Sequence, residues 1–180
     1  VGLHLGLPVP ALAAGLAGFS GLRKRQEIIG EADGVLVIDD FAHHPTALRE
    51  TLRAIAARYP GRPLWALFEA KSNTSRLNVF QRDYALAFDG AWHTIIARPY
   101  VKKDNIPPER RLDPSRLVHD LRGRGIDAQL IPEVEDIVRT VAERAKPGDI
   151  VVGMSGSAFG GVHHKILAAL QQRAATREAT

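Results

Sequence analysis

Segments with the pattern of strands and segments with the pattern of helices alternate along almost the whole chain, and this alternation most restricts its fold. Short apolar runs are typical of buried strands, and apolar residues at helical spacing are typical of helices packed on one face. We expect strands at residues 26–29, 34–38, 63–68, 92–97, 129–131 and 150–154. We expect helices at residues 11–19, 45–59, 79–88, 114–121, 134–145 and 162–171. This order indicates βαβ units and a mostly parallel α/β sheet with helices on both faces.

The first two strands depart from this parallel arrangement. Residues 30–34 contain two Gly and an Asp between two apolar runs, which predicts a hairpin. We expect the hairpin to add an antiparallel edge strand to the sheet. Ligands of such sheets bind beyond the carboxyl ends of the strands. The loops that follow Asp40, Phe68 and Met154 are therefore the candidate binding loops.

The composition limits the class of protein. The 180 residues suffice for one compact domain, and 45% hydrophobic with 24% charged residues is ordinary for a globular protein. No apolar run could span a bilayer, so no membrane partner is expected. The lack of cysteine excludes disulfides, thiolate metal ligands and cysteine nucleophiles, and fits a cytoplasmic location. The net charge of +4 arises from basic residues interleaved with acidic ones, which favours a small anionic ligand over nucleic acid.

The first candidate loop, residues 37–46, contains two carboxylates and two imidazoles just before a helix. Asp side chains bind ribose hydroxyls or metals, and His binds phosphate, stacks on a base or ligates a metal. The helix that begins after Pro45 adds free N–H groups suited to an anion. The alternative is structural, with Asp39 as a helix cap and His44 as a packed loop residue.

The second candidate loop, residues 69–76, carries an ammonium, hydroxyls, an amide and a guanidinium. These groups suit a ligand with a carboxylate or phosphate, because Arg can bind both oxygens at once. The alternative is an ordinary helix N-cap formed by residues 72–74.

The third candidate loop, residues 154–165, is rich in glycine, which lets the backbone approach a ligand, and it leads into the next helix. Its spacing fits neither the dinucleotide fingerprint nor the P-loop, and a tight strand-to-helix turn is the alternative. His163 and His164 are expected to be structural, and Trp65 and Trp92 are expected in the core.

Three motifs together resemble the Mur ligase family, whose members join amino acids or peptides to muramate nucleotides. Residues 39–46 (Asp-Asp-Phe-Ala-His-His-Pro-Thr) resemble the signature that opens the C-terminal domain, in the form used by the alanine-adding and tripeptide-recycling branches. Residues 71–74 (Lys-Ser-Asn-Thr) and 159–165 (Phe-Gly-Gly-Val-His-His-Lys) resemble the tripeptide branch. Ala70-Lys71 replaces an expected Pro-Arg, which keeps the charge but loses the bidentate fork. Residues 156–158 replace an expected Asn-Gly-Gly, so the exact acceptor stays open.

The resemblance implies a domain organisation. Residues 21–175 would form a Rossmann-like Mur ligase C-terminal domain, residues 1–20 the end of the preceding central ATPase domain, and residues 176–180 a frayed tail. The family's P-loop, magnesium ligands and nucleotide-sugar site lie on the preceding domains. This chain contains no P-loop and should be inactive alone. Residues 21–23 are hinge candidates for closure over the ATPase domain.

The resemblance also implies an activity. ATP would phosphorylate the lactyl carboxylate of UDP-N-acetylmuramate, and the amine of L-alanyl-γ-D-glutamyl-meso-diaminopimelate would attack the acyl phosphate. The cofactors would be ATP and magnesium, the latter held mainly by the central domain. The same-family alternative adds L-alanine. Residues implied to bind the nucleotide are Asp40, at the ATP ribose, with Phe41, His43 and His44. Residues implied to bind the peptide or the transferring phosphate are Lys71, Ser72, Asn73, Arg76, Ser155, Ser157 and Phe159.

Two readings from other functional classes remain open. Asp39, Asp40, His43 and His44 could ligate the metal of a phosphoesterase, provided that further Asp or His residues join them. The chain could also be a non-catalytic nucleotide-binding module that regulates a partner.

Overall fold

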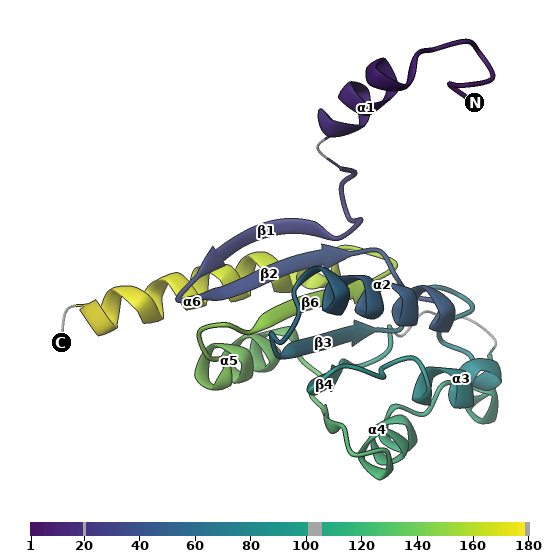
Figure 1. Cartoon of the computed structure of the whole chain (residues 1–180). Coiled ribbons are helices and arrows are strands. Elements are labelled where there is room, and N and C mark those ends of the chain that lie inside the picture. The colour runs from purple at the N-terminus through teal and green to yellow at the C-terminus, as the bar shows by residue number, and fades with distance from the viewer. Residues whose placement is uncertain (20, 101–105, 179–180) are drawn as a thin grey trace.

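Six strands form one sheet in the computed structural model, which describes residues 1–19, 21–100 and 106–178 (Figure 1). The order across the sheet is β1-β2-β6-β3-β4-β5. The strands are β1 (Glu27–Ala32), β2 (Val35–Asp40), β3 (Leu64–Glu69), β4 (His93–Ile96), β5 (Asp127–Leu130) and β6 (Ile150–Ser155). β1 and β2 are antiparallel and the other neighbours are parallel, so the predicted α/β class and antiparallel edge strand are confirmed.

Helices cover both faces of the sheet. They are α2 (Pro45–Arg58), α3 (Gln81–Ala85), α4 (Pro114–Gly123), α5 (Val134–Arg144) and α6 (Val162–Glu178), with 3-10 turns η1 (Asn78–Phe80), η2 (Pro108–Arg110) and η3 (Phe159–Gly161). A further helix, α1 (Val9–Ala17), lies apart from the sheet. Successive strand side chains point to opposite faces. Leu36 and Ile38 of β2 therefore pack with α2, α3 and α4, whereas Val35 and Val37 pack with α5 and α6.

The predicted hairpin has a two-residue turn. Asp33 and Gly34 both have positive φ, at 48° and 72°, as a type I′ turn requires. Ala32 then pairs with Val35 across the hairpin. A Cβ on Gly34 would lie 2.8 Å from the Cβ of Pro147, so this position needs glycine for space as well as for backbone conformation.

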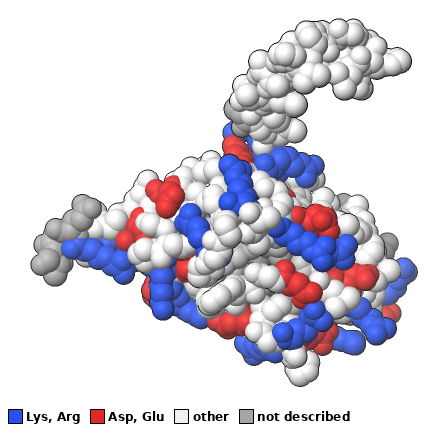
Figure 2. Space-filling view, viewed as in Figure 1, with Lys and Arg blue, Asp and Glu red and all other residues white. Residues whose placement is uncertain are grey.

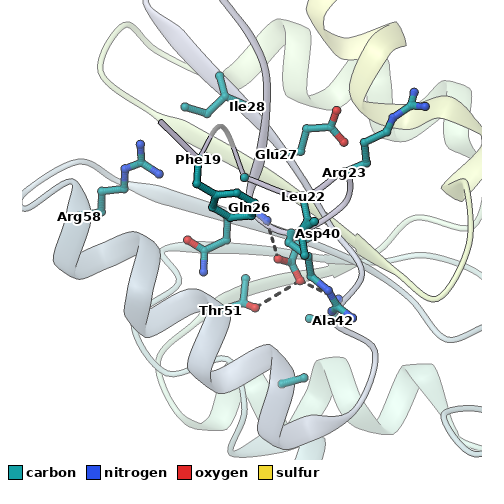
Figure 3. Close-up of a pocket in the computed structure, with 13 residues that line it drawn as sticks. Phe19, Leu22, Arg23, Gln26, Glu27, Ile28, Asp40, Ala42, Thr51 and Arg58 are labelled. Atoms are coloured by element: carbon teal, nitrogen blue, oxygen red, sulfur yellow. Dashed lines mark hydrogen bonds between the residues drawn. The ribbon is translucent and has the colours of Figure 1, made fainter. Parts of the chain in front are cut away.

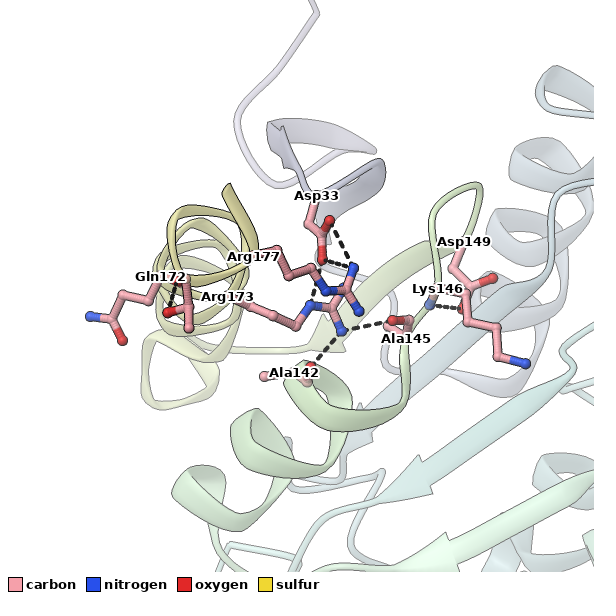
Figure 4. A network of polar contacts seen from close by, with 9 residues as sticks. Asp33, Ala142, Ala145, Lys146, Asp149, Gln172, Arg173 and Arg177 are labelled. Atoms are coloured by element: carbon pink, nitrogen blue, oxygen red, sulfur yellow. Dashed lines mark hydrogen bonds and ion pairs between the residues drawn. The ribbon is translucent and has the colours of Figure 1, made fainter. Parts of the chain in front are cut away.

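An ion-pair network holds the end of α6 against the hairpin (Figure 4). Asp33 accepts hydrogen bonds from both Arg173 and Arg177. Arg173 also donates to the carbonyl oxygens of Ala142 and Ala145, where α5 ends. These contacts stabilise the last turns of α6, which continues to Glu178 and so extends into the tail that was expected to fray. Residues 179–180 lie outside the described residues, and the fraying stays a prediction.

Two local predictions were wrong. Trp65 is buried, but Trp92 precedes the first residue of β4 and is 65% exposed. The helix expected at residues 79–88 is shortened to η1 and α3. After α3 the amides of Leu86, Ala87 and Ala91 donate to carbonyls three residues back, which is a turn pattern rather than an α-helix.

The N-terminal arm, residues 1–19, projects from the rest of the molecule (Figure 1). α1 has no buried residue, and its apolar side chains Val9 and Leu16 are exposed. The arm carries no Lys, Arg, Asp or Glu, whereas both signs of charge are interspersed over the visible face of the body (Figure 2). Among the described residues, no helix combines the length and apolarity needed to cross a membrane.

Candidate functional site

The three candidate loops meet at one edge of the sheet. They follow β2, β6 and β3, which are parallel neighbours, so their carboxyl ends lie side by side. A Cβ on Gly156 would lie 3.3 Å from the His43 ring, which places the first and third loops in contact. Ser155 Oγ donates to Glu69 Oε2 at 2.6 Å, which joins the third loop to the second. The three loops that the sequence named as candidates therefore lie together.

The two adjacent carboxylates do not act together, because they point to opposite faces of the sheet. Asp40 faces α2, where its Oδ1 accepts hydrogen bonds from the backbone N–H of Ala42 and from the Thr51 hydroxyl. Its Oδ2 accepts from the backbone N–H of Gln26. Asp39 faces α6, where His163 Nε2 lies 3.5 Å from Oδ2. The sequence placed both in one candidate loop, and the phosphoesterase alternative used both as metal ligands, but the alternation of side chains along a strand separates them.

Asp39 and His163 form a buried titratable pair. Burial raises the pKa of Asp39 above its ordinary value, opposed by the positive charges of His163 and Lys24. Burial lowers the pKa of His163, opposed by the negative charge of Asp39. His163 Nδ1 has no hydrogen-bond partner among the described residues.

The two histidines of the first loop have different environments. His43 is half-buried, with Nδ1 2.8 Å from the Phe41 carbonyl oxygen and its ring edge-to-face with Phe41. His44 is exposed, and its Nδ1 accepts from the Thr46 amide at 3.4 Å to cap α2. The cap of this helix is therefore His44, and the alternative that gave this role to Asp39 is wrong.

Arg76, in the second loop, is turned inward. Its side chain is 2% exposed and donates to Asn73 Oδ1 at 3.1 Å and to the Ser72 carbonyl oxygen at 3.4 Å. In this structure the guanidinium binds within the loop and shapes it, and the expected contact between Arg76 and a ligand stays a prediction. Lys71 is half-buried, with Nζ 4.7 Å from the ring centre of Tyr100.

No α-helix begins at residues 72–74, so the helix-cap alternative for this loop is wrong as well. The Ser72 hydroxyl accepts from the Ser75 amide and stabilises a turn. The amide nitrogen of Asn73 forms no hydrogen bond to the described residues, and the side chain is exposed.

The third loop is organised around a carboxylate that the sequence did not single out. Glu69 Oε2 accepts from Ser155 Oγ at 2.6 Å and from Ser157 Oγ at 3.1 Å. Lys24 Nζ donates to the Ser157 carbonyl oxygen at 2.9 Å. Glu69 could have been found from its position, because it ends β3 in register with Ser155.

Phe159 lies in the core rather than at the surface of the site. Its side chain is 2% exposed and packs with residues of α5 and α6. In this structure the ring is packed away from the surface, and its expected contact with the acceptor stays a prediction. Phe159 has φ 45°, a backbone conformation that few non-glycine residues adopt.

Residues 21–26, here called the linker, join the arm to β1. A cavity of about 790 Å³ lies between the linker, β1 and α2, with Asp40 among its lining residues (Figure 3). This volume is within the range of small-molecule sites, roughly 300–1,000 Å³. Arg23, Arg25 and Arg58 supply positive charge. The sequence could not reveal the cavity, because the path of the linker depends on positive φ at Lys24 and Gln26.

Within the described residues, no three His, Asp or Glu side chains converge to hold a metal ion. Asp39 and Asp40 diverge, so the phosphoesterase reading lacks the shared ligand set that it requires.

Comparison with known proteins identifies the class. The family described as Mur ligase, glutamate ligase domain, matches residues 24–157, well over half of the chain. The chain therefore belongs to the Mur ligase family and corresponds to its C-terminal domain, as the sequence motifs predicted.

Particular relatives come from two branches of that family. The UDP-N-acetylmuramate–L-alanyl-γ-D-glutamyl-meso-2,6-diaminoheptandioate ligase of Escherichia coli (strain K12) is 33% identical over 172 residues, covering 95% of this chain and 35% of that protein. The UDP-N-acetylmuramate–L-alanine ligase of Roseiflexus sp. (strain RS-1) is 34% identical over 172 residues, covering 94% of this chain and 35% of that protein. A murein peptide ligase crystal structure from Psychrobacter arcticus 273-4 superposes with a TM-score of 0.71 and 32% identity, covering 88% of this chain and 32% of that chain. This chain thus spans about a third of the length of these relatives.

Proposed function

We propose that this chain is the C-terminal domain of an ATP-dependent ligase that attaches L-alanyl-γ-D-glutamyl-meso-diaminopimelate to UDP-N-acetylmuramate. The observation that carries the proposal is the contact of three motif-bearing loops at one sheet edge. The family match over residues 24–157 supports the same reaction class. A cytoplasmic location stays a prediction.

The choice of the tripeptide as acceptor rests on two motifs. Residues 71–74 and 159–165 resemble the tripeptide branch, and the Escherichia coli relative is named for this acceptor. The same-family alternative, addition of L-alanine, is supported by the equally similar Roseiflexus relative.

The nucleotide side of the proposed site uses the first loop. Asp40 Oδ2 accepts one protein hydrogen bond and retains capacity for a ribose hydroxyl. Phe41 is half-buried and His44 is exposed, so both can contact the nucleotide, while His43 fixes the loop against Gly156. ATP would supply the phosphoryl group that activates the muramate carboxylate. Magnesium would be held mainly by the central domain.

The acceptor side uses the second and third loops. Lys71 and Asn73 offer N–H donors to a carboxylate or phosphate. We assign Arg76 and Ser72 a positioning role, because their polar atoms bind within the loop. The protein's part in the reaction is to hold the amine and the activated carboxyl group together.

The projecting arm fits the proposed domain organisation. α1 has no buried residue in this structure, which suits a helix that packs on a preceding ATPase domain. Residues 21–23 would act as the hinge. X-ray scattering of the full-length parent should show compaction on adding nucleotide, and an unchanged profile would count against closure.

The test is ADP release by the full-length parent given UDP-N-acetylmuramate and either the tripeptide or L-alanine. Turnover with the tripeptide and little with L-alanine is expected. Turnover with L-alanine would move the protein to the alanine-adding branch. No turnover with either acceptor would refute the ligase proposal.

A further inference from the structure

We define the Glu69 cluster as Glu69, Ser155 and Ser157. The hydroxyl hydrogens of both serines already form hydrogen bonds within this cluster. Each serine has one hydroxyl hydrogen, and each donates to Glu69 Oε2. Ser155 Oγ also accepts from the Ser157 amide at 3.1 Å, and Ser157 Oγ accepts from the Phe159 amide at 3.3 Å. The two hydroxyl oxygens also lie 3.2 Å apart, so one serine could donate to the other instead of to Glu69. In that arrangement too, no hydroxyl hydrogen is left for a ligand. The cluster therefore presents acceptors and no side-chain donor.

The Glu69 carboxylate gives the cluster a negative charge. Glu69 Oε1 accepts no hydrogen bond, and the carboxylate forms no ion pair, within the described part of the chain. The nearby Lys24 ammonium instead donates to the Ser157 carbonyl oxygen. Glu69 is only half-buried, so its free oxygen can reach a ligand.

This polarity decides which ligand group fits. A phosphate or carboxylate would meet a like charge and no side-chain donor at these residues. A primary ammonium carries one positive charge and three donors, and charge-assisted hydrogen bonds to a carboxylate are the strong kind. Ser155 and Ser157, expected from the sequence to bind peptide or phosphate, thus favour the amine of a peptide.

We propose that the Glu69 cluster binds an amino group of the acceptor. The inference rests on the proposed function and deepens it, since it assigns the amine and the carboxylates of the acceptor to different parts of the site. Lys71 and Asn73 on the neighbouring loop offer donors for carboxylates, while the cluster holds an amine. Glu69 becomes a specificity residue for acceptors with a free primary amine.

The first test uses the full-length parent with Glu69→Gln. The amide oxygen of Gln still accepts from the two serines, so the loop is kept while the charge is lost. The KM for the acceptor should rise about tenfold or more, with the KM values for ATP and UDP-N-acetylmuramate within about twofold. Glu50→Gln, at an exposed position on α2, is the matched control and should change none of them. An unchanged acceptor KM, or an equal rise for all three substrates, would overturn the proposal.

Two acceptors identify which amine is bound. L-Alanyl-γ-D-glutamate has only the reacting N-terminal amine, whereas the tripeptide adds the second amine of diaminopimelate. If Glu69→Gln raises the KM equally for both acceptors, the cluster binds the reacting amine. If the KM rises only for the tripeptide, the cluster binds the second amine, that of diaminopimelate.

A binding measurement on the 180-residue chain separates this inference from the reaction itself. Ethylammonium chloride, compared with sodium chloride at equal ionic strength, should shift the NMR signals of the Ser155 and Ser157 amides. Glu69→Gln should abolish the difference between the two salts. If the two salts shift the signals of wild type and variant equally, the amine site is overturned even if the parent is a ligase. If ethylammonium shifts the wild-type signals selectively but the parent shows no turnover, only the ligase proposal is refuted.

Discussion

Tyr84 connects the helical layer to the first loop of the site. Its side chain is fully buried, and its hydroxyl donates to the His43 carbonyl oxygen at 2.6 Å. Burial raises the pKa of Tyr84 well above its ordinary value, so the hydroxyl keeps its hydrogen at any ordinary pH. This neutral donor therefore helps to hold the loop between β2 and α2.

Tyr84→Phe should lower the free energy of unfolding by about 1–2 kcal/mol, because a carbonyl oxygen loses its partner. Urea unfolding followed by circular dichroism measures the change. Tyr59→Phe is the matched control, since the structure gives the Tyr59 hydroxyl no hydrogen bond to the described residues, and it should change stability by less than about 0.5 kcal/mol. Equal effects of the two substitutions would contradict the role of the Tyr84 hydroxyl.

The buried His163 should make stability depend on pH. Its folded-state pKa is lowered, so the unfolded chain takes up a proton near pH 6.5 while the folded chain resists it. The stability that neutral His163 contributes is present above that pH and is lost as the pH falls through it. The charged groups that act on it are Asp39, His164, Lys24 and Glu27.

Unfolding free energies at pH 7.5 and pH 5.5 test this effect. The wild-type chain should lose more stability between these values than His163→Gln, which cannot titrate. Asp39, whose pKa is raised, gains a proton more readily when folded and opposes the loss at the acidic end. A loss that is the same in both chains would exclude His163 as the source.

At the scale of single residues, the sequence located the loops but not the direction of their side chains. Residues 39 and 40 were correctly placed at a strand end, yet one faces α6 and the other α2. Arg76 was assigned to a ligand from its guanidinium and Phe159 from the family resemblance, whereas both are buried in this structure. Burial depends on residues distant in sequence, such as the α5 and α6 side chains around Phe159, and no local pattern contains that information.

At the scale of elements, Asp33 stabilises the hairpin and two helices together. Asp33→Asn should lower the free energy of unfolding by about 2 kcal/mol, since two arginines lose a carboxylate that is mostly buried. Glu133→Gln is the control, because its pair with Arg98 is exposed on both sides and should contribute between about 0 and 1 kcal/mol. Chemical denaturation of both variants gives the comparison, and similar values for the two would contradict the assigned role of Asp33.

The elements were predictable wherever local signals define them. Pro45 begins α2, Asp113 caps α4, and Asp33-Gly34 forms the hairpin turn, as their residue types predict. The last helix was predicted too short, because its final turns are held by ion pairs to a residue about 140 positions earlier in the chain. Long-range contacts of this kind leave no periodic pattern.

At the scale of the whole molecule, the arm should be separable from the domain. Removal of residues 1–18 should change the free energy of unfolding by less than about 0.5 kcal/mol, since α1 has no buried residue. The truncated chain should also bind less of a dye that fluoresces on exposed apolar surface. A large loss of stability would show that the arm packs on the domain in solution and would count against its assignment to a preceding domain.

The overall architecture followed from the sequence because alternating strands and helices admit few arrangements. The cavity did not follow, since it forms where the linker passes over β1 and α2. Its shape depends on the backbone at Lys24 and Gln26, whose residue types give no sign of positive φ.

The order of strands also determines when this domain can fold during synthesis. β6 is the last strand in the sequence, yet it lies between β2 and β3. A growing chain on the ribosome therefore cannot join the hairpin half of the sheet to the β3–β5 half until about residue 155 has emerged. Until then β2 and β3 expose unpaired edges, the state in which nascent chains associate with one another or with chaperones. A chain that stops before β6 should thus aggregate or be degraded, even though it retains two of the three candidate loops.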